Sequence, residues 1–226
     1  MENSSAIDRI SNLPNDNLHL ISTLNNGGIT LRPSIFILPT LVVLKLTKLH
    51  VVDNISVDLP SLKSLHLNHL FFKNKDNFNK LLNECPVLEY LETYNVYYIE
   101  EQGEGVRLKT LTKLMRANID ASDVPIKAIH NVHFLKLKMP GMSQPKINSY
   151  CRDFLALQNL IHLELCFYDI GDVFKVLQNC PKLQILSIIK WSYLHNQDLH
   201  RNWKNPNLVP KCISSHLRSC TLCYIG

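Results

Sequence analysis

Leucine recurs along this chain at a spacing that few folds can accommodate. The chain has 226 residues, of which 37 are leucine and only 7 are glycine. A template of the form Leu-x-x-Leu-x-Leu-x-x-Leu, with other apolar residues allowed, fits the chain repeatedly. Its first two matches are Leu41, Leu44, Leu46 and Leu49, and then Leu62, Leu65, Leu67 and Leu70. A repeat of this kind constrains the fold before any local preference for helix or strand is considered.

The template begins at residues 41, 62, 88, 111, 132, 160, 183 and 217, so successive units start 21, 26, 23, 21, 28, 23 and 34 residues apart. Apart from the last, these spacings fall in the range of about 20–29 residues that is typical of leucine-rich repeats. The fourth unit, with Leu111, Leu114 and Ile119 and with Arg116 at the third apolar position, is the weakest match.

The repeat predicts an α/β fold, namely a leucine-rich repeat solenoid of the ribonuclease-inhibitor-like type. Apolar and variable residues alternate within each unit, as in a short half-buried strand. One strand cannot bury its apolar face alone, so stacked units share a continuous core. We expect short parallel strands on the concave side and helices and irregular segments on the convex side. Apolar residues at helical spacing predict three of these helices: Phe78, Leu81 and Leu82; Tyr150, Phe154 and Leu157; and Val173, Phe174 and Leu177.

Composition excludes several classes of protein. Apolar residues make up 46% of the chain and charged residues 19%, which is not the balance of a disordered chain. Lysine and arginine are scattered, so the net charge of +5 does not by itself argue for nucleic acid. No apolar run approaches the roughly 18 residues that span a bilayer. The start of the chain lacks the basic and apolar regions of a signal peptide, so we expect a cytoplasmic or nuclear protein whose seven cysteines are thiols.

Two units begin with the same phrase. Residues 82–91 and residues 177–186 both read Leu-x-x-Cys-Pro-x-Leu-x-x-Leu, and the proline places Cys85 and Cys180 at helix exits. This phrase resembles the repeats of plant F-box proteins with leucine-rich repeats. The segments Leu38-Pro39-Thr40-Leu41 and Leu59-Pro60-Ser61-Leu62 resemble the shorter repeats of that family. The resemblance covers residues 36–200.

The N-terminal residues show an apolar stripe after a proline. Leu18, Ile21 and Leu24 follow Pro14 at intervals of three, which predicts a proline-started helix. Docking of such a stripe on the first repeat and docking on a partner remain open from spacing alone. The run from Asp8 through Ile21 resembles the opening of an F-box, and the family then implies that a Skp-type adaptor of a cullin ligase binds Leu13, Pro14, Leu18 and Ile21. The resemblance stops at the helix-breaking residues 25–28, so the F-box is expected to be truncated.

The C-terminal residues resemble a second module of the same family. Trp203, Val209-Pro210-Lys211-Cys212, Ser215-His216-Leu217 and Tyr224-Ile225-Gly226 are similar to the beginning of the FBD module. This module is also expected to be truncated. The expected organisation is therefore an F-box-like helix over residues 1–24, a linker over 25–37, the solenoid over 38–200, and the start of an FBD-like module over 201–226, which carries the last strand unit.

Metal and catalytic chemistry have weak signals. Cys212, His216, Cys220 and Cys223 are ligand types that zinc uses, but Cys220 falls in the apolar register of a strand, where cysteine packs well. The pairs His66/His69 and His130/His133 are three apart, and residues three apart in a strand point to opposite faces. No Gly-x-Ser-x-Gly, His-Glu-x-x-His or phosphate-binding glycine loop occurs. We expect no enzyme, no cofactor, no metal site and no catalytic residue, with a small zinc-binding or hydrolytic protein as the remote alternative.

The variable positions of the strands predict a partner-binding surface on the concave face. Large apolar residues there alternate with charged ones, which is typical of a protein-binding patch. The predicted partner-binding residues are Tyr90, Glu92, Tyr94, Met115, Phe134, Lys136, Lys138, His162 and Glu164. The other interpretation is that these aromatic side chains pack against each other or under a loop. It stays open because a register error of one residue would exchange the two faces of the strands.

The predicted function is a non-enzymatic protein-binding scaffold. By resemblance it is the substrate-recognition component of an SCF-type (Skp-cullin-F-box) ubiquitin ligase, with an unknown protein as substrate and with neither nucleic acid nor membrane as partner. The alternative is a truncated decoy or free leucine-rich repeat binder that does not dock the adaptor.

Overall fold

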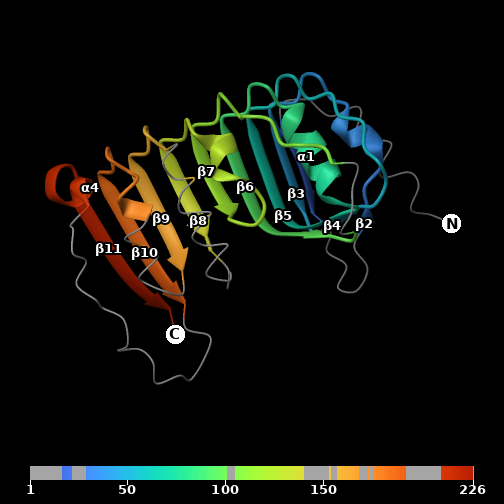
Figure 1. Ribbon diagram of the computed structural model, residues 1–226. Coiled ribbons are helices and arrows are strands. Elements are labelled where there is room, and N and C mark those ends of the chain that lie inside the picture. Colours follow the sequence, from blue (N-terminus) through green and yellow to red (C-terminus); the bar gives the residue numbers. More distant parts are fainter. Residues whose placement is uncertain are drawn as a thin grey trace. The chain divides into compact units, whose positions relative to one another are not determined.

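Short parallel strands carry most of the regular structure in the computed structural model (Figure 1). It describes residues 17–21, 29–100, 105–139, 153, 157–167, 173, 176–191 and 210–225. The chain divides into two compact units, of which unit 1 comprises residues 1–88 and 95–108 and unit 2 comprises residues 89–94 and 109–226. Strand β6 (Tyr90–Tyr98) contributes residues to both units.

Unit 1 is built on three parallel strands in the order β1-β3-β5, which span Asn17–Ile21, Val43–Thr47 and Ser64–Phe72. The short strand β2 (Ile29–Thr30) pairs with β4 (Leu49–Val51), and β4 also pairs with β5. Leu18 lies opposite Leu44 and Leu44 lies opposite Leu65. All three side chains are buried, so leucines from successive strands stack into the core of this unit.

Helix α1 (Lys75–Asn83) packs its apolar side chains into unit 1, which also contains a 3-10 helix, η2 (Pro33–Phe36). Phe78, Leu81 and Leu82 are fully buried, and the side chain of Asn74 caps the first turn by accepting a hydrogen bond from the Asn77 amide. The helix predicted through these three apolar residues is confirmed, and Cys85 follows its end as expected.

The polar side chains of α1 fasten a neighbouring loop of unit 1. The Asp76 carboxylate accepts hydrogen bonds from the amides of Gly105 and Val106, each at 2.9 Å. Asn79 Nδ2 donates to the Val106 carbonyl at 2.7 Å. A buried backbone amide is costly when it lacks an acceptor, so these side chains satisfy the loop where helix and strand geometry cannot.

Unit 2 continues the same arrangement with the first half of β6 and five further strands. Their order is β6-β7-β8-β9-β10-β11, and β7 to β11 span Arg116–Asp120, Phe134–Lys138, His162–Phe167, Ile185–Trp191 and Ser219–Ile225. Every neighbouring pair in this order is parallel. One row of inward side chains crosses the unit: Leu91, Ala117, Leu135, Leu163 and Leu186, all of them buried. A 3-10 helix, η3 (Ile126–Ile129), and helix α4 (Lys211–Ser215) also belong to this unit.

The leucine template predicted the strand register correctly in every unit but one. The fourth unit is displaced by three residues, because Ala117 rather than Leu114 lies opposite Leu91 and Leu135. Leu114, Ala117 and Ile119 are its inward residues, whereas Arg116, which the template placed inward, is exposed. The eighth unit is a true strand, since Cys220 in β11 lies opposite Leu186.

The helix predicted to begin at Pro14 is wrong over residues 17–21, which form strand β1. Leu18 and Leu20 lie opposite Leu44 and Leu46 of β3 in a parallel ladder. Spacing by two fits this segment as well as spacing by three, and pairing with β3 satisfies its backbone groups. The rest of the predicted helix lies outside the described residues.

The other two predicted helices lie mostly outside the described residues. Val173 and Leu177 are helical and buried as expected, and Val176 shares both properties. Leu157 is buried but is not helical. None of the helices among the described residues is long and apolar enough to cross a membrane.

Three residues of unit 1, one directly after β3 and one each within β5 and β6, adopt a left-handed backbone. Lys48, His69 and Asn95 have φ angles of 56°, 51° and 54° and occupy the same position in three successive repeats of the template. This residue interrupts the alternation of inward and outward side chains, so that Leu49 and Leu70 turn inward and are buried. The two-residue gap before the last apolar position of the leucine template therefore follows from the left-handed φ angle of a single residue.

Replacing His69 by valine tests this constraint. A β-branched side chain is strained in the left-handed region by roughly 1–2 kcal/mol, so His69→Val should lower the free energy of unfolding in urea by about that amount relative to His69→Gly. Both variants lose the contact of the imidazole with Asn95 Nδ2, which is 3.2 Å long, so the difference between them isolates the backbone. Equal unfolding midpoints for the two variants would contradict this account.

Candidate functional site

The outward face of unit 2 gathers the polar and aromatic side chains that alternate with its buried leucines. By register they form three rows across β6 to β9. The first row is Tyr90, Arg116, Phe134 and His162, the second is Glu92, Asn118, Lys136 and Glu164, and the third is Asp120, Lys138 and Cys166, with Tyr94 in contact with Lys138. Most of these residues are half-buried, because neighbouring parallel strands hold their side chains about 5 Å apart.

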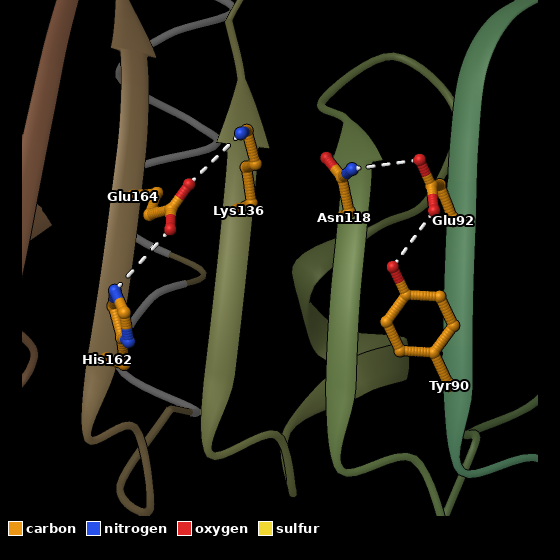
Figure 2. A network of polar contacts seen from close by, with 6 residues as sticks. All are labelled: Tyr90, Glu92, Asn118, Lys136, His162 and Glu164. Carbon is orange, nitrogen blue, oxygen red and sulfur yellow. Dashed lines mark hydrogen bonds and ion pairs between the residues drawn. The ribbon is translucent and has the colours of Figure 1, made fainter.

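Two hydrogen bonds hold Glu92 in place on this face (Figure 2). The Tyr90 hydroxyl donates to Glu92 Oε2 at 2.9 Å, and Asn118 Nδ2 donates to Glu92 Oε1 at 3.3 Å. Burial, followed by the hydrogen bond to Glu92, raises the pKa of Tyr90 to about 12, against a smaller lowering by Arg116. Tyr90 therefore stays a neutral hydrogen-bond donor at physiological pH.

A second polar group joins β8 and β9 (Figure 2). Lys136 Nζ lies 3.1 Å from Glu164 Oε2, and His162 Nε2 lies 3.6 Å from Glu164 Oε1. Burial lowers the pKa of His162, while Glu164 raises it and Arg116 lowers it. The carboxylate of Glu164 is thus shared between one permanent cation and one group that is neutral at physiological pH.

Aromatic rings hold the remaining cations of the face. The guanidinium of Arg116 lies 4.7 Å from the centre of the Phe134 ring, and Phe134 meets the imidazole of His162 edge to face at 4.7 Å. Lys138 Nζ lies 3.4 Å from the centre of the Tyr94 ring. Burial lowers the pKa of Lys138, partly offset by Cys166, Asp120 and Glu92. Cation–π contacts of this kind are worth roughly 0.5–2 kcal/mol each.

The structure brings together the predicted partner-binding residues with one exception. Tyr90, Glu92, Tyr94, Phe134, Lys136, Lys138, His162 and Glu164 all lie at outward positions of β6, β8 and β9; their binding of a partner stays a prediction. Met115 is 43% exposed but precedes β7, and Ala117, expected to face outward beside it, is fully buried. The register error in the fourth unit is the cause.

Three outward residues of β7 were missed for the same reason: Arg116, Asn118 and Asp120. The signal was present in the sequence, since Ala117 and Ile119 alternate behind Leu114 as the second and third apolar positions do in other units. A template that accepts alanine at a leucine position would have found them.

Two of the four predicted adaptor-binding residues, Leu18 and Ile21, lie in strand β1. Leu13 and Pro14 lie outside the described residues. Leu18 is buried in β1 at 5% exposure, facing the core rather than a partner. Ile21 ends β1 opposite Thr47.

The cysteine and histidine pairs considered for metal binding have other contacts. Cys212 is buried and its thiol donates to the Leu177 carbonyl, while Cys220 and Cys223 are exposed in β11. His66 contacts Ser64, and His69 contacts Asn95. Among the described residues, no group of three or more histidine, cysteine, aspartate or glutamate side chains is arranged to hold a metal ion.

These features define an α/β protein in which recurring parallel strands present an outward face of aromatic and paired charged side chains. No protein-family model matches the chain. Known proteins do. One named as an FBD-associated F-box protein of Arabidopsis thaliana is 30% identical over 249 residues, which covers 84% of this chain and 56% of the relative. A second Arabidopsis FBD-associated F-box protein is 25% identical over 235 residues, covering 84% of this chain and 53% of the relative.

A further relative carries the repeat in its name. A protein of Arabidopsis thaliana named as an F-box/FBD/LRR-repeat protein is 48% identical over 146 residues, covering 62% of this chain and 29% of the relative. The chain belongs to this plant family of F-box/FBD/LRR-repeat proteins. It spans about half the length of the FBD-associated F-box relatives that it matches.

Titration of His162 tests the electrostatics of the face. We expect its pKa to lie below the ordinary value of 6.5, to fall further in Glu164→Gln, and to rise in Arg116→Gln. Because the folded state binds the proton less well, the contribution of His162 to stability is present above pH 6.5 and is lost as the pH falls below that value. Proton NMR of the imidazole, assigned by comparison with His162→Gln, reads these shifts. A shift in the opposite direction in either variant would overturn the assignment of causes, and Glu100→Gln in unit 1 is the control.

Proposed function

We propose that the chain is a non-enzymatic protein-binding scaffold and that the outward face of unit 2 holds its partner. The observation that carries the proposal is the ordered set of aromatic side chains, Tyr90, Tyr94 and Phe134, each in contact with a charged or polar neighbour. Aromatic residues and arginine supply most of the binding energy at protein interfaces. The backbone ladder and these contacts hold them in place on β6 and β8, so little side-chain entropy remains to be lost on binding.

The family supplies the wider context of this proposal. The relatives are named as F-box proteins, and the proposed fold is a leucine-rich repeat solenoid with the outward face as its concave side. The chain would then be the substrate-recognition component of an SCF-type ubiquitin ligase. Its mechanism is proximity, because it holds a target protein near subunits that transfer ubiquitin. Such a component acts in the cytoplasm or nucleus, which localisation of a fluorescent fusion checks.

One observation favours a second candidate function, that of a free binder that does not dock the adaptor. Leu18, at a position that the resemblance assigns to the adaptor, is buried in β1 opposite Leu44. Adaptor docking through Leu18 would require β1 to leave its ladder with β3. The outward face of unit 2 contains no residue of β1, so partner binding does not depend on this choice.

Substitution of the aromatic residues tests partner binding. Purified Tyr94→Ser and Phe134→Ser should retain the co-purifying partner about thirtyfold less well than the unsubstituted chain, since loss of a central aromatic anchor costs about 2 kcal/mol or more. Tyr97→Ser is the matched control, because Tyr97 is an exposed tyrosine of the same strand that belongs to unit 1. Mass spectrometry of captured proteins reads the result. An unchanged set of partners in both test variants would contradict the proposal.

An adaptor pull-down separates the two candidate functions. If the chain docks a Skp-type adaptor, immobilised adaptor should retain it, and Leu13→Asp should abolish retention by placing a charge at a position that the family uses for docking. Asp53→Ala, which removes an exposed charge in unit 1, is the control. Failure of the unsubstituted chain to bind the adaptor would leave the free binder as the function.

A further inference from the structure

The acidic side chains on the outward face of unit 2 have polar contacts within the protein. Glu92 accepts hydrogen bonds from Tyr90 and Asn118, and Glu164 contacts Lys136 and His162. Asp120 accepts hydrogen bonds from the amide and the hydroxyl of Ser122, at 3.2 and 3.0 Å. The three acidic side chains of the face therefore already have partners within the protein.

Two cations of the face, Arg116 and Lys138, rest on aromatic rings without an ion pair or hydrogen bond among the described residues, and of the two only Arg116 is exposed. Its guanidinium rests on the Phe134 ring at 4.7 Å. A guanidinium presents five N–H donors in a planar fork that fits a carboxylate with two parallel hydrogen bonds. Packing on the Phe134 ring covers one face of the planar guanidinium and leaves the N–H donors at its edge available to a partner.

Exposed apolar groups lie at different distances from this cation, since Met115 directly precedes it in the chain, whereas Ile185 is three strands away in the strand order. Met115 and Ile185 are 43% and 37% exposed. Ile185 lies opposite His162 in the same row as Arg116 and Phe134. A ligand that places a carboxylate on Arg116 therefore meets apolar surface beside it.

We infer that Arg116 is the anchor for a carboxylate that a protein partner carries next to an apolar side chain. This inference rests on the proposed function and names the chemistry of the partner. One exposed cation on a face that also carries Glu92 and Glu164 suits one carboxylate, whereas a polyanion such as nucleic acid would meet both of these acids. The occupant is a peptide segment of a protein, with a Leu-Glu or Glu-Leu dipeptide as its simplest form.

The test uses the full chain and synthetic decapeptides with mixed residues on either side of a fixed core. The cores are Leu-Glu, Leu-Gln, Ala-Glu and Leu-phosphoserine, and binding is measured by fluorescence polarisation. We expect the Leu-Glu pool to bind about tenfold more tightly than the Leu-Gln pool, as for a charge-assisted hydrogen bond, and more tightly than the Ala-Glu pool. Arg116→Gln should remove the preference for glutamate over glutamine, and Arg116→Lys should retain only part of it, because lysine cannot form the bidentate pair.

Arg218→Gln is the matched control, since Arg218 is an exposed arginine of unit 2 next to β11, three strands away from β8 in the strand order. It removes the same charge and should leave the preference intact. The absence of a glutamate preference in the unsubstituted chain, including the absence of all binding, overturns the inference, as does a preference that persists in Arg116→Gln or a stronger preference for phosphoserine. If Tyr94→Ser and Phe134→Ser still abolish partner capture while glutamate and glutamine bind alike, the inference fails and the proposed function stands.

Discussion

The structure depends on the lateral pairing of parallel strands that are too short to bury anything alone. A five-residue strand such as β3 turns only Leu44 and Leu46 toward the core, and its backbone groups need partners on both edges. Each neighbour supplies both needs at once, because the ladder that satisfies the backbone also brings the inward leucines of the two strands into contact. The pairing leaves the outward side chains free of any role in the core. Binding groups can therefore vary there without loss of the fold.

The left-handed residues refine this arrangement in unit 1. An unbroken strand would turn alternate residues inward indefinitely, and its apolar face would grow with its length. The φ of about 50–56° at Lys48, His69 and Asn95 reverses the alternation once in each repeat, so that Leu49, Leu70 and Val96 close the core. This reversal explains why two residues, rather than one, separate the last two apolar positions of the template.

Much of this could be predicted from the sequence, because the repeat fixes the register of one strand against the next. The outward positions of β6, β8 and β9 followed directly from the leucines on either side of them. The failures have a common physical origin. In the fourth unit, Leu111 and Leu114 are three residues apart, like the first two apolar positions of the template, so the template placed them there. Only the pairing of Ala117 with the buried residues Leu91 and Leu135 shows that alanine fills the second leucine position. In β1, Leu18 and Ile21 fit helical spacing while Leu18 and Leu20 fit a strand, and pairing with β3 decides between them. Contacts remote in sequence settled both cases, and a local pattern does not contain them.

The register of β7 also decides what the outward face can recognise. If Met115 and Ala117 faced outward, as the template suggested, the centre of the face would be apolar. With Arg116 and Asn118 in those positions, the face gains one donor for Glu92 and one exposed cation that forms no ion pair with the acids of the face. Glu92 and Glu164 already have contacts within the protein, so a competitor for either must replace an existing contact and bear the cost of desolvation. The exposed guanidinium carries no such cost, and it is the register of β7 that places it on this face.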